Sequence, residues 1–510
     1  MEQQKFLKQS RKSLLGILFS RTTLIVLLLL LNFCLLFSFL LGFFDGLPAF
    51  LGSMVLFTAM VLIYVLNTDT NPTVKLSWCI LIGILPIFGT ALYFYVRSDL
   101  GHRMVKRIVN SSVADSLSYV EKASQDPDDL PDIAHYLKTQ THADAYTNSD
   151  VQYFSLGELA FEEMLRQMES AEKFIFLEYF IIEPGEMWSR MLDILYRKAQ
   201  AGVEVRVLYD GTCSITTLPS NYPQQLRKLG IHCKAFAPVR PFVSTHYNYR
   251  DHRKILIIDG HTAFTGGINI ADEYINVRKK HGHWKDNALM IQGQAVQGFT
   301  LLFLQMWNYS ERERVFEPYL GLPEPVVGNG CVIPFGCGPS DPEQVGKMVY
   351  LNLLNQAKDH VYIMTPYLIL DGEMVTAMQF ASKRGVDVRL ILPHIPDKKY
   401  AFLLAQSHYR ELLDAGVKIY EYALGFVHSK VFLCDDTQAV VGTINLDYRS
   451  LYLHYECAAY LWKVPALAEI RQDFLDTFKK STLITKETIQ KTSLLAKFIT
   501  AILKLLAPLM

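Results

Sequence analysis

The most constraining feature of this 510-residue chain is a His-x-Lys-x4-Asp pattern that occurs twice. The six motif residues are His252, Lys254, Asp259, His428, Lys430 and Asp435. Each motif is followed by a Gly-x-x-Asn sequence, which ends at Asn269 in the first copy and at Asn445 in the second. Every one of these positions lies 176 residues after its counterpart, as 252 to 428 and 269 to 445 show. One such pattern is weak evidence, but two in register predict a duplicated fold.

The sequence around each motif supports the duplication. Before each motif, an apolar strand is followed by a helical stretch and then by a second strand that begins with Gly. The predicted strand, helix and strand are 173–179, 187–201 and 202–208 in the first copy and 360–365, 372–384 and 385–391 in the second. This order is typical of a βαβ unit with a right-handed crossover. We therefore predict an α/β fold of two pseudo-symmetric halves, each with a mostly parallel sheet flanked by helices.

The predicted domain boundaries follow from this repeat and from composition. A segment rich in Gly and Pro, 321–341, separates the two copies. The predicted regions are a membrane anchor at 1–100, a connector at 101–150, the first half at 151–325, the second half at 326–482 and a C-terminal amphipathic basic helix at 483–510. That last helix has two open interpretations, namely a helix at the lipid interface or a helix docked on the body.

Three uncharged apolar runs precede the body, at 22–44, 47–66 and 76–96. Each is long enough to cross roughly 30 Å of hydrocarbon as a helix, so we predict two or three transmembrane helices and a multi-pass protein of the cell membrane. Basic residues precede the first run and follow the third, and both clusters favour the cytoplasm. With three spans the two basic clusters would lie on opposite sides of the membrane, so they cannot both be cytoplasmic. We rely on the cluster beside the body and place the catalytic region in the cytoplasm.

Composition disfavours several other classes of protein. Lys and Arg number 50 and Asp and Glu number 50, so the chain lacks the net positive charge that nucleic-acid-binding proteins use. The eight Cys form no C-x-x-C pair, which favours reduced thiols over a disulfide framework. Zinc-ligand spacing is also absent from the sequence, so we predict no metal and no cofactor.

The motif residues suit the binding of a phosphate diester. Residues i and i+2 of a strand face the same side, so His252 and Lys254 should point together, as should His428 and Lys430. If the halves pack with pseudo-twofold symmetry, the two His and two Lys converge on one site. Lysine then supplies the positive charge that a phosphate needs without a metal ion, and the two Asn side chains add neutral donors.

These paired motifs resemble those of the phospholipase D superfamily, and in finer detail those of its bacterial cardiolipin synthases. The segments that carry the finer resemblance are 249–254, 266–274, 284–286, 365–367 and 442–450. The resemblance covers about 72–477, and the additional apolar run at 22–44 departs from it. It implies that the substrates are membrane phospholipids, phosphatidylglycerol and cardiolipin, and that no nucleic acid is bound.

The resemblance also implies a two-step reaction through a phosphohistidine. One His attacks the phosphorus of a phosphatidylglycerol, and the other protonates the departing glycerol before it activates a second phosphatidylglycerol. Our hypothesis takes His252 as the nucleophile and His428 as the acid and base. By family analogy an acidic residue after each motif orients the His of that motif, which assigns Asp286 to His252 and Glu456 to His428. Asp259 and Asp435 are then structural supports.

Two other functions compete with this interpretation. The first is a phospholipase D that hydrolyses the lipid to phosphatidic acid, because the same residues serve water or an alcohol as acceptor. The second is a non-enzymatic membrane scaffold, which predicts a broken motif, whereas all six residues are present. The sequence leaves the acceptor and the oligomeric state open.

Overall fold

A computed structural model describes residues 47–98, 100–120, 130–238, 248–321, 323–487, 489 and 494–509. These residues form two compact units. The larger unit, called the body here, includes Val105–Pro238 and Asn248–Ser493 and contains every motif residue. The smaller, helical unit contains the described parts of Gln9–Met104 and Leu494–Met510.

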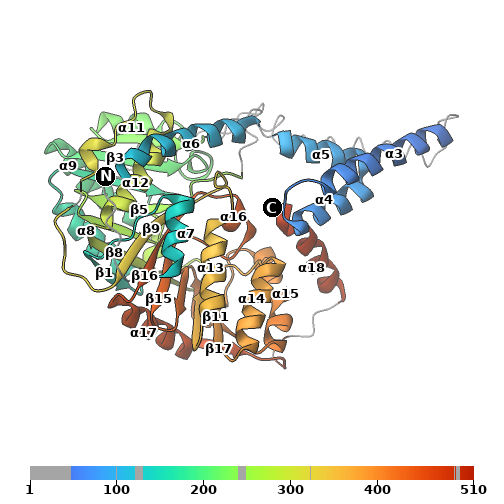
Figure 1. The fold of residues 1–510 in the computed structure, drawn as a ribbon. Helices are drawn as coiled ribbons and strands as arrows, with labels where there is room; N and C mark the ends of the chain where they lie inside the picture. The colour runs from blue at the N-terminus through green and yellow to red at the C-terminus, as the bar shows by residue number, and fades with distance from the viewer. Residues whose placement is uncertain are drawn as a thin grey trace. The chain divides into compact units, whose positions relative to one another are not determined.

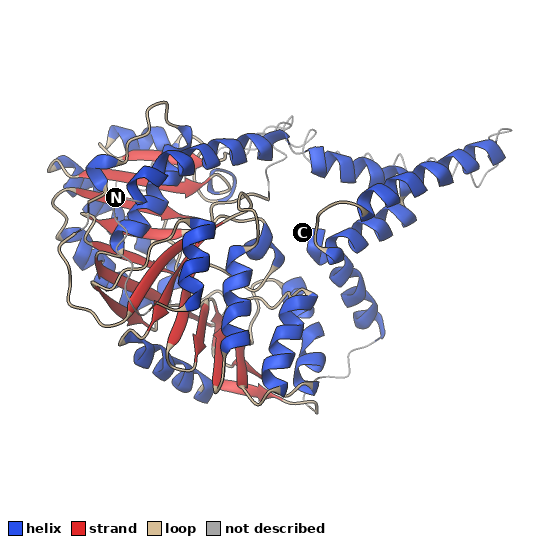
Figure 2. Cartoon of the chain, viewed as in Figure 1, coloured by secondary structure: helices blue, strands red, loops and turns tan. Residues whose placement is uncertain are grey.

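The body contains two mixed sheets, one from each predicted half (Figures 1 and 2). The first has the order β1-β8-β6-β5-β2-β3-β4 and consists of β1 (Ser149–Phe154), β2 (Phe174–Tyr179), β3 (Glu204–Asp210), β4 (His232–Phe236), β5 (Lys254–Ile258), β6 (Thr262–Gly266) and β8 (Ala288–Gly293). The second has the order β17-β12-β11-β10-β14-β15-β16-β9 and consists of β9 (Cys331–Cys337), β10 (His360–Met364), β11 (Asp387–Pro393), β12 (Lys418–Tyr422), β14 (Val431–Cys434), β15 (Gln438–Gly442), β16 (Glu456–Trp462) and β17 (Ser481–Ile484). The shorter β7 (His283–Lys285) and β13 (Gly425–Val427) pair in parallel and join the two halves.

Both βαβ units are present where the sequence predicts them, but the sheets are not mostly parallel. Parallel pairing joins β2 to β3 and β10 to β11 across helices α9 (Glu186–Gln200) and α14 (Gly372–Lys383), and it continues to β4 and β12. The other pairings between described strands of these two sheets are antiparallel. For the β5–β6 pair the reason is local, because these strands are joined by a tight turn in which Asp259 and Gly260 have positive φ. Only an antiparallel pair can close so short a connection.

The body is layered around these sheets. Its other helices are α6 (Leu100–Val120), α7 (Asp132–Thr141), α8 (Gly157–Glu169), α10 (Cys213–Thr216), α11 (Tyr222–Lys228), α12 (Val296–Trp307), α13 (Val345–Gln356), α15 (Lys399–Asp414), α16 (Tyr448–Tyr452) and α17 (Ala466–Lys479), with 3-10 turns η2 (Asp272–Ile275), η3 (Asn308–Ser310) and η4 (Glu317–Tyr319). Successive residues of β5 face different cores, since Ile255 belongs to a cluster shared by both sheets and Leu256 to the outer cluster of the first half. Helices α13, α14 and α15 lie along the second half (Figure 1). The shared inner core fixes the two halves against each other.

The helical unit consists of α3 (Leu47–Leu66), α4 (Pro72–Ile84), α5 (Pro86–Ser98), α18 (Leu494–Leu506) and η5 (Ala507–Leu509). The predicted helix at 76–96 is wrong as one element, because it is interrupted at Leu85 before Pro86, whose ring removes a backbone donor. In the part of the chain that is described, no helix is long and apolar enough to cross a membrane, so the predicted spans are not confirmed. The run at 22–44 lies outside the described residues. Helix α18 exposes Phe498 and Ile502, and η5 packs on α4.

Candidate active site

The two His-x-Lys pairs lie at equivalent positions in the halves, directly before or at the start of a central strand. Lys254 opens β5, whereas Lys430 directly precedes β14, so the pairs lie largely in the preceding loops rather than within a strand as predicted. Each lysine folds back on its own motif. Lys254 Nζ donates to the His252 carbonyl oxygen at 2.6 Å, and Lys430 Nζ donates to the His428 carbonyl oxygen. All four side chains are buried.

Each of these loops is anchored on the opposite half of the body. The backbone N–H of His252 donates to the Tyr455 carbonyl at 2.9 Å, and the N–H of His428 donates to the Lys285 carbonyl at 2.7 Å. The same contacts extend into a bridge between Asp251 and Tyr455 and into the β7–β13 pair. The two histidines therefore meet because the halves exchange backbone hydrogen bonds at the same point of each fold.

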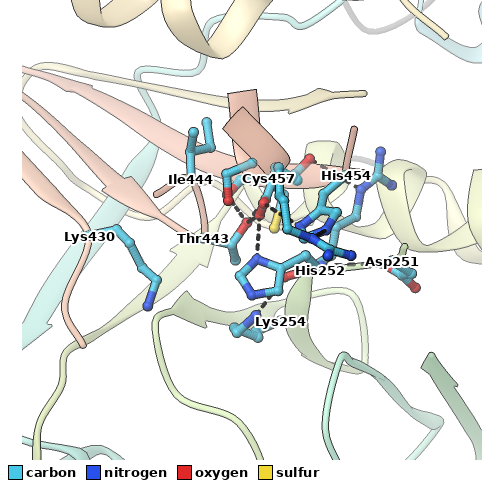
Figure 3. Close-up of polar contacts among 12 residues, drawn as sticks. Asp251, His252, Lys254, Lys430, Thr443, Ile444, His454 and Cys457 are labelled. Carbon is cyan, nitrogen blue, oxygen red and sulfur yellow. Dashed lines mark hydrogen bonds and ion pairs between the residues drawn. The ribbon is translucent and has the colours of Figure 1, made fainter. Parts of the chain in front are cut away.

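The carboxylates that hold the histidines are crossed between the halves. His252 Nδ1 lies 2.8 Å from Glu456 Oε2, and His428 Nδ1 lies 2.7 Å from Asp286 Oδ2. The sequence-based pairing, in which each acid serves the motif before it, is therefore wrong. Each half supplies one histidine and the carboxylate for the other. Figure 3 shows His252 with Lys254 on one side and Thr443 and His454 on the other, while Lys430 extends toward the same space.

Burial shifts the titration of both lysines toward neutrality. Desolvation lowers the pKa of Lys254 to about 8 and that of Lys430 to about 7, although neighbouring carboxylates oppose the shift. Without a bound anion, burial therefore makes the protonated forms of Lys254 and Lys430 unfavourable in free energy. An anion such as a phosphate diester would stabilise the charged form of both lysines.

The two histidine–carboxylate pairs differ electrostatically. Burial would raise the pKa of Asp286, but the charge and hydrogen bond of His428 outweigh it and the pKa is lowered. Burial raises the pKa of Glu456 to about 8, even though Lys254 and Thr443 act in the opposite direction. The pKa of His428 is lowered by burial to about 4 against the favourable charge of Asp286, and burial lowers that of His252 well below its usual value. Asp286 is therefore the more firmly ionised carboxylate.

The remaining motif residues lie apart from the histidines. Asp259 and Asp435 stand at the far ends of β5 and β14, each with positive φ. The carboxylate of Asp259 accepts three backbone N–H bonds at 2.7 Å from residues 172, 173 and 174, and Asp435 repeats this at residues 358, 359 and 360. These bonds fix the start of the neighbouring strands β2 and β10.

The two asparagines have different surroundings. Asn269 is engaged locally, because its oxygen accepts from the Ile181 N–H at 3.1 Å and its amide donates to the Tyr274 hydroxyl at 2.7 Å. The side-chain oxygen of Asn445 is buried and, among the described residues, has no hydrogen-bond partner. The two asparagines are thus equivalent in sequence but not in hydrogen bonding.

The structure adds residues that motif analysis missed. Thr443 Oγ1 donates to Glu456 Oε2 at 2.5 Å, and its place inside the second Gly-x-x-Asn sequence was a usable signal. The His454 ring lies beside the His252 ring, tilted by 39° with ring centroids 5.3 Å apart, and nothing in the spacing pointed to it. Ligand atoms of His252, His454 and Glu456 lie within 4.8 Å of one another, close enough for a shared metal ion. The buried ammonium groups of Lys254 and Lys430 oppose a cation there, so the donor set fits hydrogen bonding better than metal binding.

Two segments of the chain, 164–307 and 350–478, match the family described as "Cardiolipin synthase, PLD-like domain". The chain belongs to this family. The resemblance to bacterial cardiolipin synthases of the phospholipase D superfamily is thereby confirmed. Residues 56–97 also match the family described as "Phospholipase D-nuclease N-terminal".

Individual relatives agree with this assignment. A cardiolipin synthase of Geobacillus kaustophilus is 35% identical over 482 residues, which cover 92% of this chain and 96% of the relative. An uncharacterized protein of Streptococcus mutans is 49% identical over 88% of this chain and 99% of its own length. Among solved structures, a phosphatidylserine synthase of Haemophilus influenzae superposes with a TM-score of 0.55 at 15% identity and covers 71% of this chain and 95% of its own. That likeness concerns the fold alone.

Proposed function

We propose that this protein is a cardiolipin synthase that transfers a phosphatidyl group from one phosphatidylglycerol to another and releases glycerol. The observation that carries the proposal is the crossed arrangement of two His–carboxylate pairs around two buried lysines. Such a site offers a nucleophile, a proton carrier and two cations for one phosphate diester. The names of relatives at 32–35% identity over most of the chain support the same activity.

The reaction runs in two displacements at phosphorus. In the first, Nε2 of His252 attacks phosphorus, the bond from phosphorus to the glycerol oxygen breaks, and His428 gives its proton to that oxygen. In the second, His428 takes the proton from a hydroxyl of the incoming phosphatidylglycerol. The hydroxyl oxygen bonds to phosphorus, and the phosphorus–nitrogen bond breaks to free His252. Lys254 and Lys430 bind the non-bridging phosphate oxygens in both steps.

The assignment of roles rests on the difference between the carboxylates. A general acid must carry a proton at the start, whereas burial lowers the pKa of His428 to about 4 before substrate binds. The negative charge of a bound phosphate diester raises that pKa, and the ionised Asp286 stabilises the protonated His428 that results. His252 must begin neutral with Nε2 free, which requires its proton on Nδ1, facing Glu456. The site therefore divides the two duties between chemically similar residues.

We also propose that the enzyme works at the bacterial membrane, where its lipid substrates are. Helix α3 exposes several large apolar side chains, including Val55, Leu56 and Ile63, each more than 60% exposed. Exposed apolar patches of this kind are typical of surfaces that contact lipid or another protein. Helix α18 also exposes large apolar side chains, namely Phe498, Ile499 and Ile502.

The test is a lipid assay with purified protein in vesicles of labelled phosphatidylglycerol without divalent metal. We expect cardiolipin and free glycerol in equal amounts, and no turnover by His252→Ala or His428→Ala. A denaturing quench at alkaline pH, where the phosphorus–nitrogen bond of a phosphohistidine is stable, should trap label on the wild-type protein and none on His252→Ala. Phosphatidic acid as the sole product would show that water is the acceptor, which is the phospholipase D alternative.

A further inference from the structure

The two halves place different residues at one equivalent position beside the site. In the first sheet the motif residue Gly266 pairs with Ala288, and in the second Gly442 pairs with Ala458. Asp286 and Glu456 each stand two residues before that partner, so sheet register makes them equivalent although their sequence spacing differs. Two residues further back, the first half has Trp284 and the second half has His454.

Both of these residues pack on the histidine of the opposite motif. The Trp284 ring lies 5.4 Å from the His428 ring, and the His454 ring lies 5.3 Å from the His252 ring. The geometry is thus shared, but the chemistry is not. An indole covers one histidine, whereas the other has a second imidazole beside it (Figure 3).

The tautomer of His454 follows from its contact with Arg449. Arg449 Nε donates to His454 Nε2 at 3.2 Å, so in the neutral ring the proton resides on Nδ1. That Nδ1 lies 3.6 Å from Glu456 Oε1. Both atoms are buried, and within the described residues neither has a hydrogen-bond partner, so this contact is electrostatic and longer than a hydrogen bond. The other oxygen, Oε2, already serves His252 and Thr443.

The charge state of Glu456 decides which nitrogen of His252 is free. An ionised carboxylate accepts the proton of His252 Nδ1 and leaves Nε2 unprotonated. A neutral carboxyl group can instead donate to Nδ1, which places the proton of the ring on Nε2. Because burial brings the pKa of Glu456 to about 8, both states are accessible near neutral pH. Every donor to Glu456 therefore favours the reactive tautomer of His252.

Other groups also act on this pair. Those that face Glu456 are Lys254 on β5, Lys430 before β14, Asp447 before α16, Cys337 on β9 and Tyr350 on α13, in addition to His252, Thr443, Ser450 and His454. Those that face His454 are Arg449, Lys254, Arg250, Lys398, His252 and Glu456. Most of the charged members are cations, which act in the same direction as a donor to Glu456.

We propose that His454 is a positioning residue for the transfer reaction: its Nδ1–H, which faces Glu456 Oε1 at 3.6 Å, favours the ionised form of Glu456 electrostatically and so keeps Nε2 of His252 free to attack phosphorus. This inference rests on the proposed function, in which His252 is the nucleophile. Trp284 lies at the equivalent position beside His428 and carries a donor, Nε1–H, but within the described residues this donor has no hydrogen-bond partner. The difference between His454 and Trp284 at this equivalent position therefore gives His252 and His428 different chemical surroundings.

The test compares two substitutions of the same size. Asn places an amide nitrogen where His454 carries Nδ1 and retains a donor, whereas Leu has the shape of Asn without it. The rate with phosphatidylglycerol in mixed micelles is measured from pH 5.5 to 9.5 for wild type, His454→Asn and His454→Leu. For His454→Leu we expect the apparent pKa of the acid limb in the kcat/KM profile to rise by about one pH unit. At pH values below that limb, this corresponds to about a tenfold loss of kcat/KM. KM and the rate at high pH should stay near wild type, as should the profile of His454→Asn.

A second variant and a control separate positioning from folding. Arg449→Met leaves the His454 ring in place but frees its Nε2, so it should move the acid limb in the same direction as His454→Leu. His408→Leu removes another buried histidine that contacts a carboxylate, Glu411 on α15, and should leave the limb unchanged.

Three results would overturn the inference, namely an unshifted limb in His454→Leu, a loss that is equal at all pH values, or a His454→Asn profile that matches Leu. If wild type makes no cardiolipin at all, the proposed function fails instead. The two failures are therefore distinguishable within one set of measurements.

Discussion

The crossed pairing predicts that Asp286 is coupled energetically to His428 of the other half and not to His252 of its own. The perturbation is Asp286→Asn. One carboxylate oxygen accepts from His428 Nδ1 at 2.7 Å, and the other accepts from the Asn287 N–H at 2.9 Å, with the side chain fully buried. An amide has one acceptor, so one of the two donors loses its partner whichever way the amide faces.

The magnitude follows from that lost bond. A hydrogen bond to a charged group contributes about 1.5–3 kcal/mol. In kinetics the same energy is about a 10- to 150-fold loss in kcat/KM. In stability it should appear as a coupling of about 1.5–3 kcal/mol between Asp286→Asn and His428→Ala in a double-mutant cycle of urea unfolding at pH 7. The pKa of Asp286 is lower in the folded protein than in the unfolded chain, so its ionisation stabilises the fold at pH values above the unfolded-state pKa. This contribution is lost on acidification, and a measurement at pH 7 therefore includes it in full.

The refuting result comes from the parallel cycle with His252→Ala. We expect that coupling to stay within about 0.5 kcal/mol, because His252 contacts Glu456 instead. A larger coupling of Asp286 to His252 than to His428 would contradict the crossed geometry. Two couplings near zero would show that neither carboxylate orients a histidine.

Three other substitutions test the rest of the site. Burial lowers the pKa of Lys430 to about 7 and a bound phosphate raises it again, so affinity for short-chain phosphatidylglycerol should be highest below pH 7 and fall as pH rises. In calorimetric titration, Lys430→Gln should flatten that dependence and weaken binding roughly tenfold. Asp259→Ala removes three backbone hydrogen bonds and leaves Ala at positive φ, so urea unfolding should show a loss of about 3 kcal/mol with kcat retained. Asp473 Oδ2 lies 2.8 Å from the buried Lys285 Nζ, so Asp473→Asn leaves that ammonium without its counter-charge and should lower the free energy of unfolding by about 3 kcal/mol. Replacing Lys285 by Met and Asp473 by Leu together should recover most of that loss.

Much of the fold was predictable because it depends on local patterns. The apolar strands and amphipathic helices of both βαβ units lie within two residues of the predicted bounds. The direction of the remaining strands was not predicted, because alternation of side chains carries no information on parallel or antiparallel pairing. The Asp259–Gly260 turn was a local signal for a hairpin, and the mostly parallel assignment overlooked it.

The four central motif residues come together as predicted, but their partners could not be assigned by spacing. The 176-residue offset holds through Asn269 and Asn445 and then fails, because Asp286 and Glu456 follow these asparagines at different distances. Their equivalence appears only in the sheet register. Which histidine each acid serves depends on how the halves pack, and no local pattern encodes that contact.

The crossed pairing makes the site depend on both halves of the fold. Neither half contains a complete His–carboxylate pair, since His252 depends on Glu456 and His428 depends on Asp286. The two lysines likewise come from different halves, since Lys254 opens β5 and Lys430 directly precedes β14. Catalytic geometry is therefore set by the shared inner core and by the β7–β13 pair rather than by either sheet alone. The duplicated motif supplies equal parts, and a difference such as His454 against Trp284 can then assign them unequal duties without altering the motif itself.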